Sequence, residues 1–461
     1  MDAARSRSST DEIVARLERL PTSWWQVKAR IIVGVATFFD AFDALAIASI
    51  LPVIAPLWKL TPQEIGFMIS AGFVGQLLGA LLFGFVAERY GRMTAMIWSI
   101  ALFAVMSLVC AFAWDYNSLL LFRTIQGIGL GGEVPVAAVF ISELARAQGR
   151  GRFVLLYELV FPIGLTTASL IGLWVVPRFG WQYMFVVGAL PAFLALALRS
   201  LLPESPRWLA VRGRNAEAEA AMALIEAETQ KATGAPLPPP QPVVATLDKP
   251  ASWADLFGEL YLRRTLVVWV IWFSAYFVNY GLSIWLTTVY RTVFQLPLDI
   301  ALGYGFITQV VGLVGTLICA LAIDHVGRRL WFALSFAAAA LALGALAMVP
   351  HPTAEHVLIS MTIAYFFVST INIGVYLYTP ELYPTRVRAV GVGTATAWLR
   401  FASIIGPMVV GTMIGARLTP AQIPDLPKVF LAFAVVAAIA AAITGIFAVE
   451  TKGRVLEEAS P

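Results

Sequence analysis

This sequence has few charged residues, cysteines and histidines for its length. Charged residues make up 13% of the 461 positions, about half the roughly 25% of an ordinary soluble protein. There are two cysteines, Cys110 and Cys319, and three histidines, and neither a phosphate-binding GxxxxGKS/T loop nor an HExxH zinc motif occurs. We therefore expect no enzyme activity, no cofactor, no metal site and no ATP-driven step.

Apolar residues take the place of the missing charge. They reach 59% of the chain, and runs of about 20 of them, enough to cross a bilayer of about 30 Å, recur along it. Helices are expected because a segment in lipid must satisfy its own backbone hydrogen bonds. We predict an all-α membrane protein with twelve transmembrane helices, near 30–56, 64–87, 94–113, 118–144, 153–176, 181–202, 264–290, 301–324, 330–349, 355–380, 388–416 and 427–450.

Positively charged residues are concentrated on one side of this arrangement. Of the 32 lysines and arginines, 25 fall on the side of both termini, five fall on the opposite side, and two lie within spans. Because such residues mark the cytoplasmic side, both termini and the long middle loop are predicted to be cytoplasmic. The net charge of +4 follows from this topology and does not indicate nucleic-acid binding. No cleavable signal peptide is expected, because the N-terminal segment lacks an apolar core.

The long middle loop divides the chain into two sets of six spans. We interpret it as a flexible tether, with a regulatory module as the alternative. Residues 11–20 fit a short amphipathic helix lying on the cytoplasmic surface. The predicted parts are a cytoplasmic N-terminal tail at 1–29, a six-helix bundle at 30–202, a cytoplasmic linker at 203–263, a second bundle at 264–450 and a cytoplasmic C-terminal tail at 451–461.

The loop after the second span is repeated after the eighth. GFVAERYGRM and ALAIDHVGRR both carry an acid, two spacers, a glycine and an arginine, and further acid-and-base clusters recur at the ends of spans four and ten and of spans six and twelve. Glycine permits a tight turn, and arginine can bind carboxylates through two parallel hydrogen bonds. The clusters either fix topology only or form a cytoplasmic gate that breaks and re-forms as the halves rock. The predicted gate residues are Glu88, Arg89, Arg92, Glu143, Arg150, Glu204, Arg207, Asp324, Arg328, Arg329, Glu381, Arg388 and Glu450.

These motifs carry a family resemblance. The two loops resemble the loop motif of the major facilitator superfamily, apart from Glu88 where the pattern has Asp, and PESPRWL, PELYPTRVRAVG and ETKGRVLEE resemble signatures of its sugar-porter and organic-ion branch. FFDAFD, GLGGEVPVAAVFISE and GVGTATAWLRFASIIGPMVVG are similar to the bacterial metabolite–proton symporters, which include aromatic-acid and niacin transporters and relatives of the synaptic-vesicle two proteins. The resemblance covers essentially the whole chain. It implies two pseudo-symmetric six-helix bundles around a central site.

Six ionisable residues lie well inside the predicted spans, where a charge costs about 2.5–3.5 kcal/mol. Asp40 and Asp43 share a helix face, and nearby buried carboxylates raise each other's proton affinity. The aromatic-acid members of the resembling group carry an Asp-x-x-Asp at this place. The alternatives are that one of these two acids only pairs with Arg123, or that they make capped polar contacts. The predicted proton-coupling residues are Asp40, Asp43, Arg123, Glu133 and Glu158.

Arg400 lies near the middle of the eleventh span, where sites of this fold are expected. A guanidinium can hold a carboxylate with two donors, and the resemblance points the same way, because organic-anion relatives carry Arg here and organic-cation relatives carry Asp. The alternative is an ion pair with Asp40 or Glu133. Span seven adds aromatic, hydroxyl and amide side chains on one helix face. The predicted substrate-binding residues are Arg400, Tyr276, Asn279, Tyr280, Gln309, Asn372, Tyr376 and Tyr157.

Together these features predict a proton-coupled importer of a small organic carboxylate, aromatic in character and similar to nicotinate or benzoate. It would work by alternating access as a monomer in a bacterial inner membrane, with the acid, protons and the lipid bilayer as partners and no nucleic acid. A sugar–proton symporter would fit PESPR and ETKG, but Arg400 suits a neutral sugar poorly. An organic-cation or drug transporter would suit the acids of span one, but Arg400 opposes it.

Overall fold

The computed structural model describes residues 11–21, 23–144, 159–240, 253–414 and 418–452, and these form helices without any strand. Tyr157, Glu158 and Arg150 lie outside the described residues. Eleven helices of this part are long and apolar enough to cross a membrane, and α17, with Arg400 in its middle, completes the twelve predicted spans. The spans are α2 (Trp24–Leu57), α3 (Pro62–Tyr90), α4 (Arg92–Cys110), α5 (Tyr116–Leu144), α7 (Val160–Phe179), α8 with α9 (Gln182–Gly188, Pro191–Leu201), α12 with α13 (Glu259–Ser283, Leu286–Thr292), α14 (Leu298–Val326), α15 (Arg328–Ala347), α16 (Ala354–Glu381), α17 (Thr385–Met413) and α18 (Leu426–Phe447).

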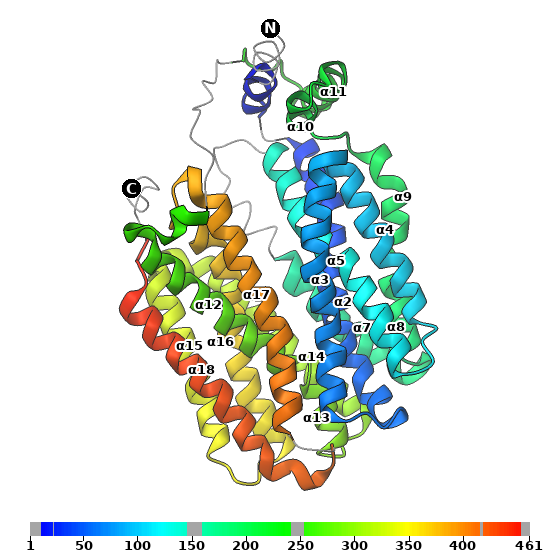
Figure 1. Ribbon diagram of the computed structural model, residues 1–461, viewed down its shortest axis with the longest axis vertical. Coiled ribbons are helices and arrows are strands. Elements are labelled where there is room, and N and C mark those ends of the chain that lie inside the picture. The colour runs from blue at the N-terminus through cyan, green and yellow to red at the C-terminus, as the bar shows by residue number, and fades with distance from the viewer. Residues whose placement is uncertain (1–10, 22, 145–158, 241–252, 415–417, 453–461) are drawn as a thin grey trace.

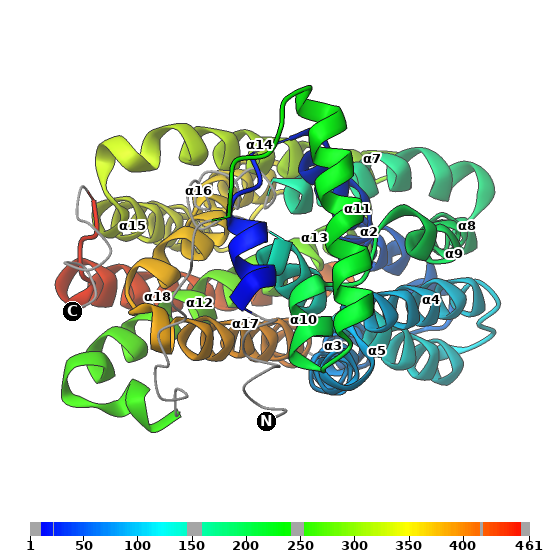
Figure 2. The same cartoon turned by 90° about the horizontal axis from the view of Figure 1, so that it is seen from above.

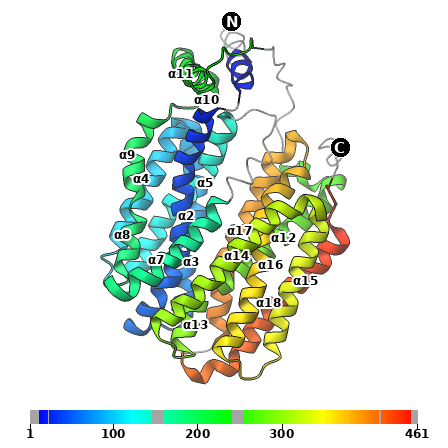
Figure 3. The same cartoon turned by 180° about the vertical axis from the view of Figure 1, so that it is seen from behind.

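The helices form two bundles, α2 to α9 and α12 to α18, which lie side by side (Figures 1 and 3). The first described residues, the end of α18 and the linker helices lie at the same end of the molecule (Figure 1), which we call the linker side; the opposite end is the far side. Helices α2, α3 and α7 of the first bundle pack against α13, α17 and α14 of the second. The bundles lie close together on the far side and diverge toward the linker side (Figure 1).

Glycines set how closely α3 and α5 approach. A Cβ added at Gly75 or Gly127 would come within about 2.2 Å of a carbonyl oxygen on the other helix, and one at Gly131 within 1.9 Å of the Gln76 carbonyl. At Gly132 it would meet the Phe83 ring at 2.3 Å. Side chains larger than hydrogen would push the helices apart, so these glycines fix the position of the polar residues that follow them on α5.

Two predicted spans differ from the expected single helices. Span six breaks at Ala189 and Leu190, and Pro191 starts α9, where its missing N–H needs no partner. Span seven breaks at Ile284 and Trp285, so α13 is a separate short helix on the far side. Each pair still crosses as one apolar stretch.

The described part of the linker contains two packed helices, α10 (Pro206–Val211) and α11 (Asn215–Thr233). The helical residues 11–18 lie beside α11 (Figure 2). Ile13 and Leu17 are buried in one apolar cluster with Met222 and Ile225 of α11. The amphipathic helix was therefore predicted correctly, but its apolar face is covered by α11 and not by a membrane surface.

Ion pairs hold the same segment in place. Arg16 contacts Glu219 at 2.6 Å and Glu226 at 2.8 Å, and Arg19 contacts Glu226 at 2.6 Å. Glu18 pairs with Arg207 at 3.2 Å. We call residues 11–20 together with α11 the N-terminal cap. The short η1 (Trp253–Phe257) precedes α12, and η2 (Pro420–Asp425) precedes α18.

Candidate functional site

A cavity lies between the two bundles, with a volume of about 850 Å³ that includes its open part. It is lined by helices of both halves. Seven of the eight residues predicted to bind substrate line this one cavity, and the eighth, Tyr157, is outside the described residues. The seven are Tyr276, Asn279, Tyr280, Gln309, Asn372, Tyr376 and Arg400.

Arg400 projects into this cavity from α17. Its Nη1 donates a hydrogen bond to the side-chain oxygen of Gln76 on α3, in the other half. Within the described part of the chain it makes no direct ion pair with an acid, although Asp40 lies close enough to interact with its charge. The guanidinium thus keeps donors for an anion in the cavity.

Aromatic side chains form one wall of the cavity. Trp272 stacks on Tyr276 with ring centroids 5.7 Å apart, and Tyr376 meets Trp272 edge-on at 4.8 Å. Tyr280 packs against Phe73 of the first half at 5.0 Å. Trp272 itself is fully buried and donates to the Thr379 hydroxyl at 2.8 Å, so it supports the tyrosines from behind. These rings offer flat apolar surfaces to a planar molecule.

Polar groups complete the lining. The side-chain oxygens of Asn279 and Asn372 are buried and have no hydrogen-bond partner among the described residues. Tyr365 donates to the Gln309 oxygen at 2.7 Å. The cavity can therefore hold a molecule with an anionic end and a further hydrogen-bonding group.

Sequence reasoning missed three of the lining or supporting residues. Gln76, Tyr365 and Thr37 are single polar residues within apolar helices, as in FVGQLLG and IAYFFVS. A single polar residue in an apolar span was the feature that could have revealed them, because such a residue needs a polar partner. Which of them faces the cavity depends on helix packing.

Asp40 and Glu133 form a buried acidic pair beside the cavity. Asp40 lines the cavity, yet is 2% exposed, and one of its carboxylate oxygens has no hydrogen-bond partner in the described structure. Glu133 is fully buried and accepts from the Thr37 hydroxyl at 3.3 Å, while its other oxygen has no hydrogen-bond partner among the described residues. Thr37 lines the cavity too, so it connects Glu133 with the open space.

Asp43 and Arg123 form a separate buried ion pair. Arg123 Nη1 lies 2.8 Å from one Asp43 oxygen and 3.0 Å from the other. Gln126 donates to Asp43 at 2.8 Å and accepts from Arg123 at 3.1 Å. Asp43 is thus the acid that pairs with Arg123, the alternative that the sequence left open, whereas Asp40 makes no ion pair among the described residues.

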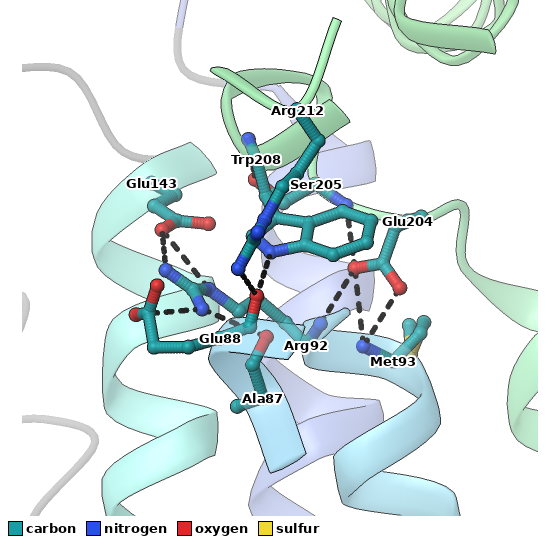
Figure 4. Close-up of polar contacts among 9 residues, drawn as sticks. All are labelled: Ala87, Glu88, Arg92, Met93, Glu143, Glu204, Ser205, Trp208 and Arg212. Carbon is teal, nitrogen blue, oxygen red and sulfur yellow. Dashed lines mark hydrogen bonds and ion pairs between the residues drawn. The ribbon is translucent and has the colours of Figure 1, made fainter. Parts of the chain in front are cut away.

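The first charge cluster joins four helix ends on the linker side of the first half (Figure 4). Arg92 contacts Glu88 at 2.9 Å and Glu143 at 3.0 Å. Glu204 accepts from the backbone N–H groups of Arg92 at 3.0 Å and Met93 at 3.1 Å. The Trp208 indole and Arg212 both donate to the Glu88 carbonyl, which fastens the linker to this loop.

The second half repeats this cluster. Arg328 contacts Asp324 at 2.8 Å and Glu381 at 3.0 Å. Glu450 accepts from the backbone N–H groups of Arg328 at 2.9 Å and Arg329 at 3.1 Å. Each cluster joins helix ends within one half.

The turns in both clusters require glycine. Gly91 and Gly327 have φ of +107° and +102°, a region that suits glycine. A Cβ would also lie 2.3 Å from Glu204 at the first and 2.6 Å from Glu450 at the second.

Three predicted gate arginines have other contacts. Arg89 lies over the Tyr90 ring at 5.7 Å. Arg207 pairs with Glu18, and Arg388 donates to the carbonyl oxygen of Pro380 at 3.0 Å. Arg207 therefore links the N-terminal cap to α10 of the linker.

Comparison with known proteins shows which family has this architecture. The family model described as sugar (and other) transporter matches residues 31–461. The chain belongs to this transporter family. It is 33% identical to the niacin transporter NiaP of Acinetobacter baylyi, over 97% of this chain and 99% of the relative. It is 29% identical to the 4-hydroxybenzoate transporter PcaK of the same species, over 90% of each chain.

Other relatives confirm the predicted branch of the major facilitator superfamily. The synaptic vesicle 2-related protein of Xenopus laevis is 28% identical over 95% of this chain and 80% of that protein. The partially occluded inward open structure of the xylose transporter XylE from E. coli superposes with a TM-score of 0.71 at 21% identity, covering 94% of this chain and all of XylE. The major facilitator fold is therefore confirmed, and the chain is a multi-pass membrane transporter and not an enzyme.

Proposed function

We propose that this transporter carries a small, planar organic carboxylate together with protons across a bacterial inner membrane, as a monomer. The observation that carries the proposal is Arg400, which projects into the cavity between the halves without an acidic partner in the described chain. A cation in that position costs free energy unless it is paired. A substrate carboxylate supplies the pairing charge and the two oxygens that a guanidinium binds best.

The remaining lining supports an aromatic acid. Tyr276, Tyr280 and Tyr376 present rings on which a flat molecule can stack, and the oxygens of Asn279 and Asn372 can accept from a donor on its edge. NiaP and PcaK, which resemble this chain over nearly its full length, are named as transporters of niacin and of 4-hydroxybenzoate. Both ligands are planar aromatic carboxylic acids.

Asp40 and Glu133 are the proposed proton carriers. Burial disfavours the charged form of a carboxylic acid, and neither residue makes a direct ion pair among the described residues. Asp40 faces the cavity that holds Arg400, so its protonation can respond to an anion bound there. Arg123 and Asp43, in contrast, neutralise each other. We assign them to holding α2 against α5.

The proposed cycle is alternating access with the linker side in the cytoplasm, as the distribution of lysine and arginine favours. The bundles are held together on the far side and diverge toward the linker side (Figure 1). Movement of the bundles about the cavity would expose Arg400 to each side in turn. The two charge clusters, which hold helix ends within each half, would let each bundle move as a unit and contribute to the cytoplasmic gate.

The test is uptake into liposomes containing the purified protein. Radiolabelled nicotinate and benzoate are supplied with and without an inward proton gradient. We expect accumulation only with the gradient, and Arg400→Ala should reduce uptake of the acid at least about a hundredfold, the scale of losing a charged pair in a closed site. Uptake by Arg400→Ala equal to that of the parent would refute the carboxylate contact.

A further inference from the structure

The helices α3 and α17 meet along a seam that runs from the far side to the centre of the molecule. A Cβ at Gly411 would lie 2.5 Å from the Pro62 carbonyl, and one at Gly66 3.0 Å from that of Pro407. Deeper in, Ser70 donates to the carbonyl of Ile404 at 2.7 Å. The contacts therefore advance along α3 as they recede along α17, as expected for antiparallel neighbours.

The hydrogen bond from Arg400 to Gln76 lies at the inner end of this seam. Beyond it, toward the linker side, α3 and α17 separate (Figure 1). Gln76 is 3% exposed, and its backbone is pressed against Gly131 of α5, so its side chain has little freedom to move away on its own. The bond therefore joins the two halves at the edge of the cavity.

We propose that the Gln76 side-chain oxygen holds the place of a substrate carboxylate oxygen on Arg400. An amide oxygen and a carboxylate oxygen are both planar acceptors, but the carboxylate carries charge and makes the stronger bond. Binding of the acid then replaces a bond between the halves by a bond to the substrate. Gln76 is thus a positioning residue that lowers affinity for the acid and releases the inner end of the seam when Arg400 is occupied.

This inference rests on the proposed function, because it needs an acid that binds Arg400. It also predicts that loss of the Gln76 amide changes the affinity for the acid in the opposite direction from loss of a packing contact. Loss of a packing or ligand contact weakens binding, whereas loss of a competitor strengthens it. Removing the amide should therefore tighten the binding of an acid, and a fixed carboxylate at the same place should block it.

The experiment measures dissociation constants of nicotinate and benzoate on the purified full-length protein by isothermal titration. Gln76→Leu removes the acceptor, and Gln76→Met removes it with a side chain closer in shape to glutamine. Gln76→Glu supplies a permanent carboxylate. We expect the first two to bind the acid about tenfold more tightly, the scale of one hydrogen bond to a charged group. Gln76→Glu should bind it at least about tenfold more weakly.

Ser70→Ala is the matched control, because it removes the neighbouring bond of the same seam without touching Arg400. It should leave the affinity for the acid unchanged. If Arg400→Ala abolishes acid binding but Gln76→Leu and Gln76→Met weaken it or leave it unchanged, the competitor role is overturned and the proposed function stands. If acid binding is insensitive to Arg400→Ala, the proposed function fails and the inference with it.

Discussion

Asp40 and Asp43 are three residues apart on α2, yet their carboxylates have opposite surroundings. Asp43 lies in an ion pair with Arg123, while Asp40 faces the cavity with an unpartnered oxygen among the described contacts. The sequence could predict that both were buried acids on one face. It could not decide which one Arg123 would neutralise, because that choice depends on the packing of α5 against α2.

Asp40→Asn should uncouple transport from the proton gradient. The amide cannot bind and release a proton, but it keeps the shape of the carboxyl group, so the cavity and Arg400 remain. We expect gradient-driven accumulation in liposomes to fall to the equilibrium level while exchange of labelled for unlabelled acid continues. Full accumulation by Asp40→Asn would move the proton role to another residue.

Asp43→Asn should act mainly on stability. Removing one partner of a buried ion pair leaves Arg123 uncompensated, which costs about 3–5 kcal/mol. We expect a marked fall in the thermal unfolding temperature of the detergent-purified protein. Adding Arg123→Gln should recover much of that loss, because the second change removes the orphaned charge. A single variant as stable as the parent would contradict the structural assignment.

At the scale of elements, the hydropathy pattern was sufficient to place the spans to within a few residues, because backbone groups in lipid leave helices as the only choice. It did not predict the breaks at Ala189 and at Ile284, since both lie inside continuous apolar runs. The cavity residues of α12 were predicted from their spacing on one face. Gln76 was not, because its importance comes from a partner more than 300 residues away in the chain.

The N-terminal cap should be weakened by acid. Burial tends to raise the pKa of Glu226, but hydrogen bonds from Arg16 and Arg19 outweigh it, so the pKa lies below its ordinary value. A lowered pKa in the docked state means that the ionised form stabilises docking. This contribution is complete above the ordinary glutamate range and is lost as the pH falls through the lowered pKa.

Glu226→Gln should reproduce that loss at neutral pH. We expect faster hydrogen–deuterium exchange in residues 11–20 and in α11, because the two arginines lose their shared carboxylate. Glu228→Gln, two residues along the same helix, is the control and should not change the exchange. Equal protection in Glu226→Gln and the parent would show that apolar packing alone holds the cap.

At the scale of the whole molecule, the internal repeat was readable from the sequence because the same acids, glycine and arginine recur in both loops. In the structure, Arg92 and Arg328 contact corresponding acids of the two halves, Glu143 and Glu381. The cavity breaks this symmetry. The first half brings Asp40 and Glu133, and the second brings Arg400 and the aromatic wall. The proposed proton carriers and the proposed carboxylate site therefore lie in different bundles.

A cross-link on the far side should separate binding from transport. Thr287 of α13 donates to the carbonyl of Ala48 on α2, so the halves touch there. Joining Ala48→Cys to Thr287→Cys with a short bifunctional thiol reagent should hold the far side closed and leave the linker side open. Both native cysteines are first replaced by alanine, because Ala48 and Thr287 are themselves buried and burial would not distinguish the engineered thiols from the native ones. We expect the cross-linked protein to bind nicotinate with unchanged affinity but to lose uptake in liposomes, while each single-cysteine variant, treated alike, keeps both. Continued uptake after complete cross-linking would contradict alternating access by movement of the two bundles.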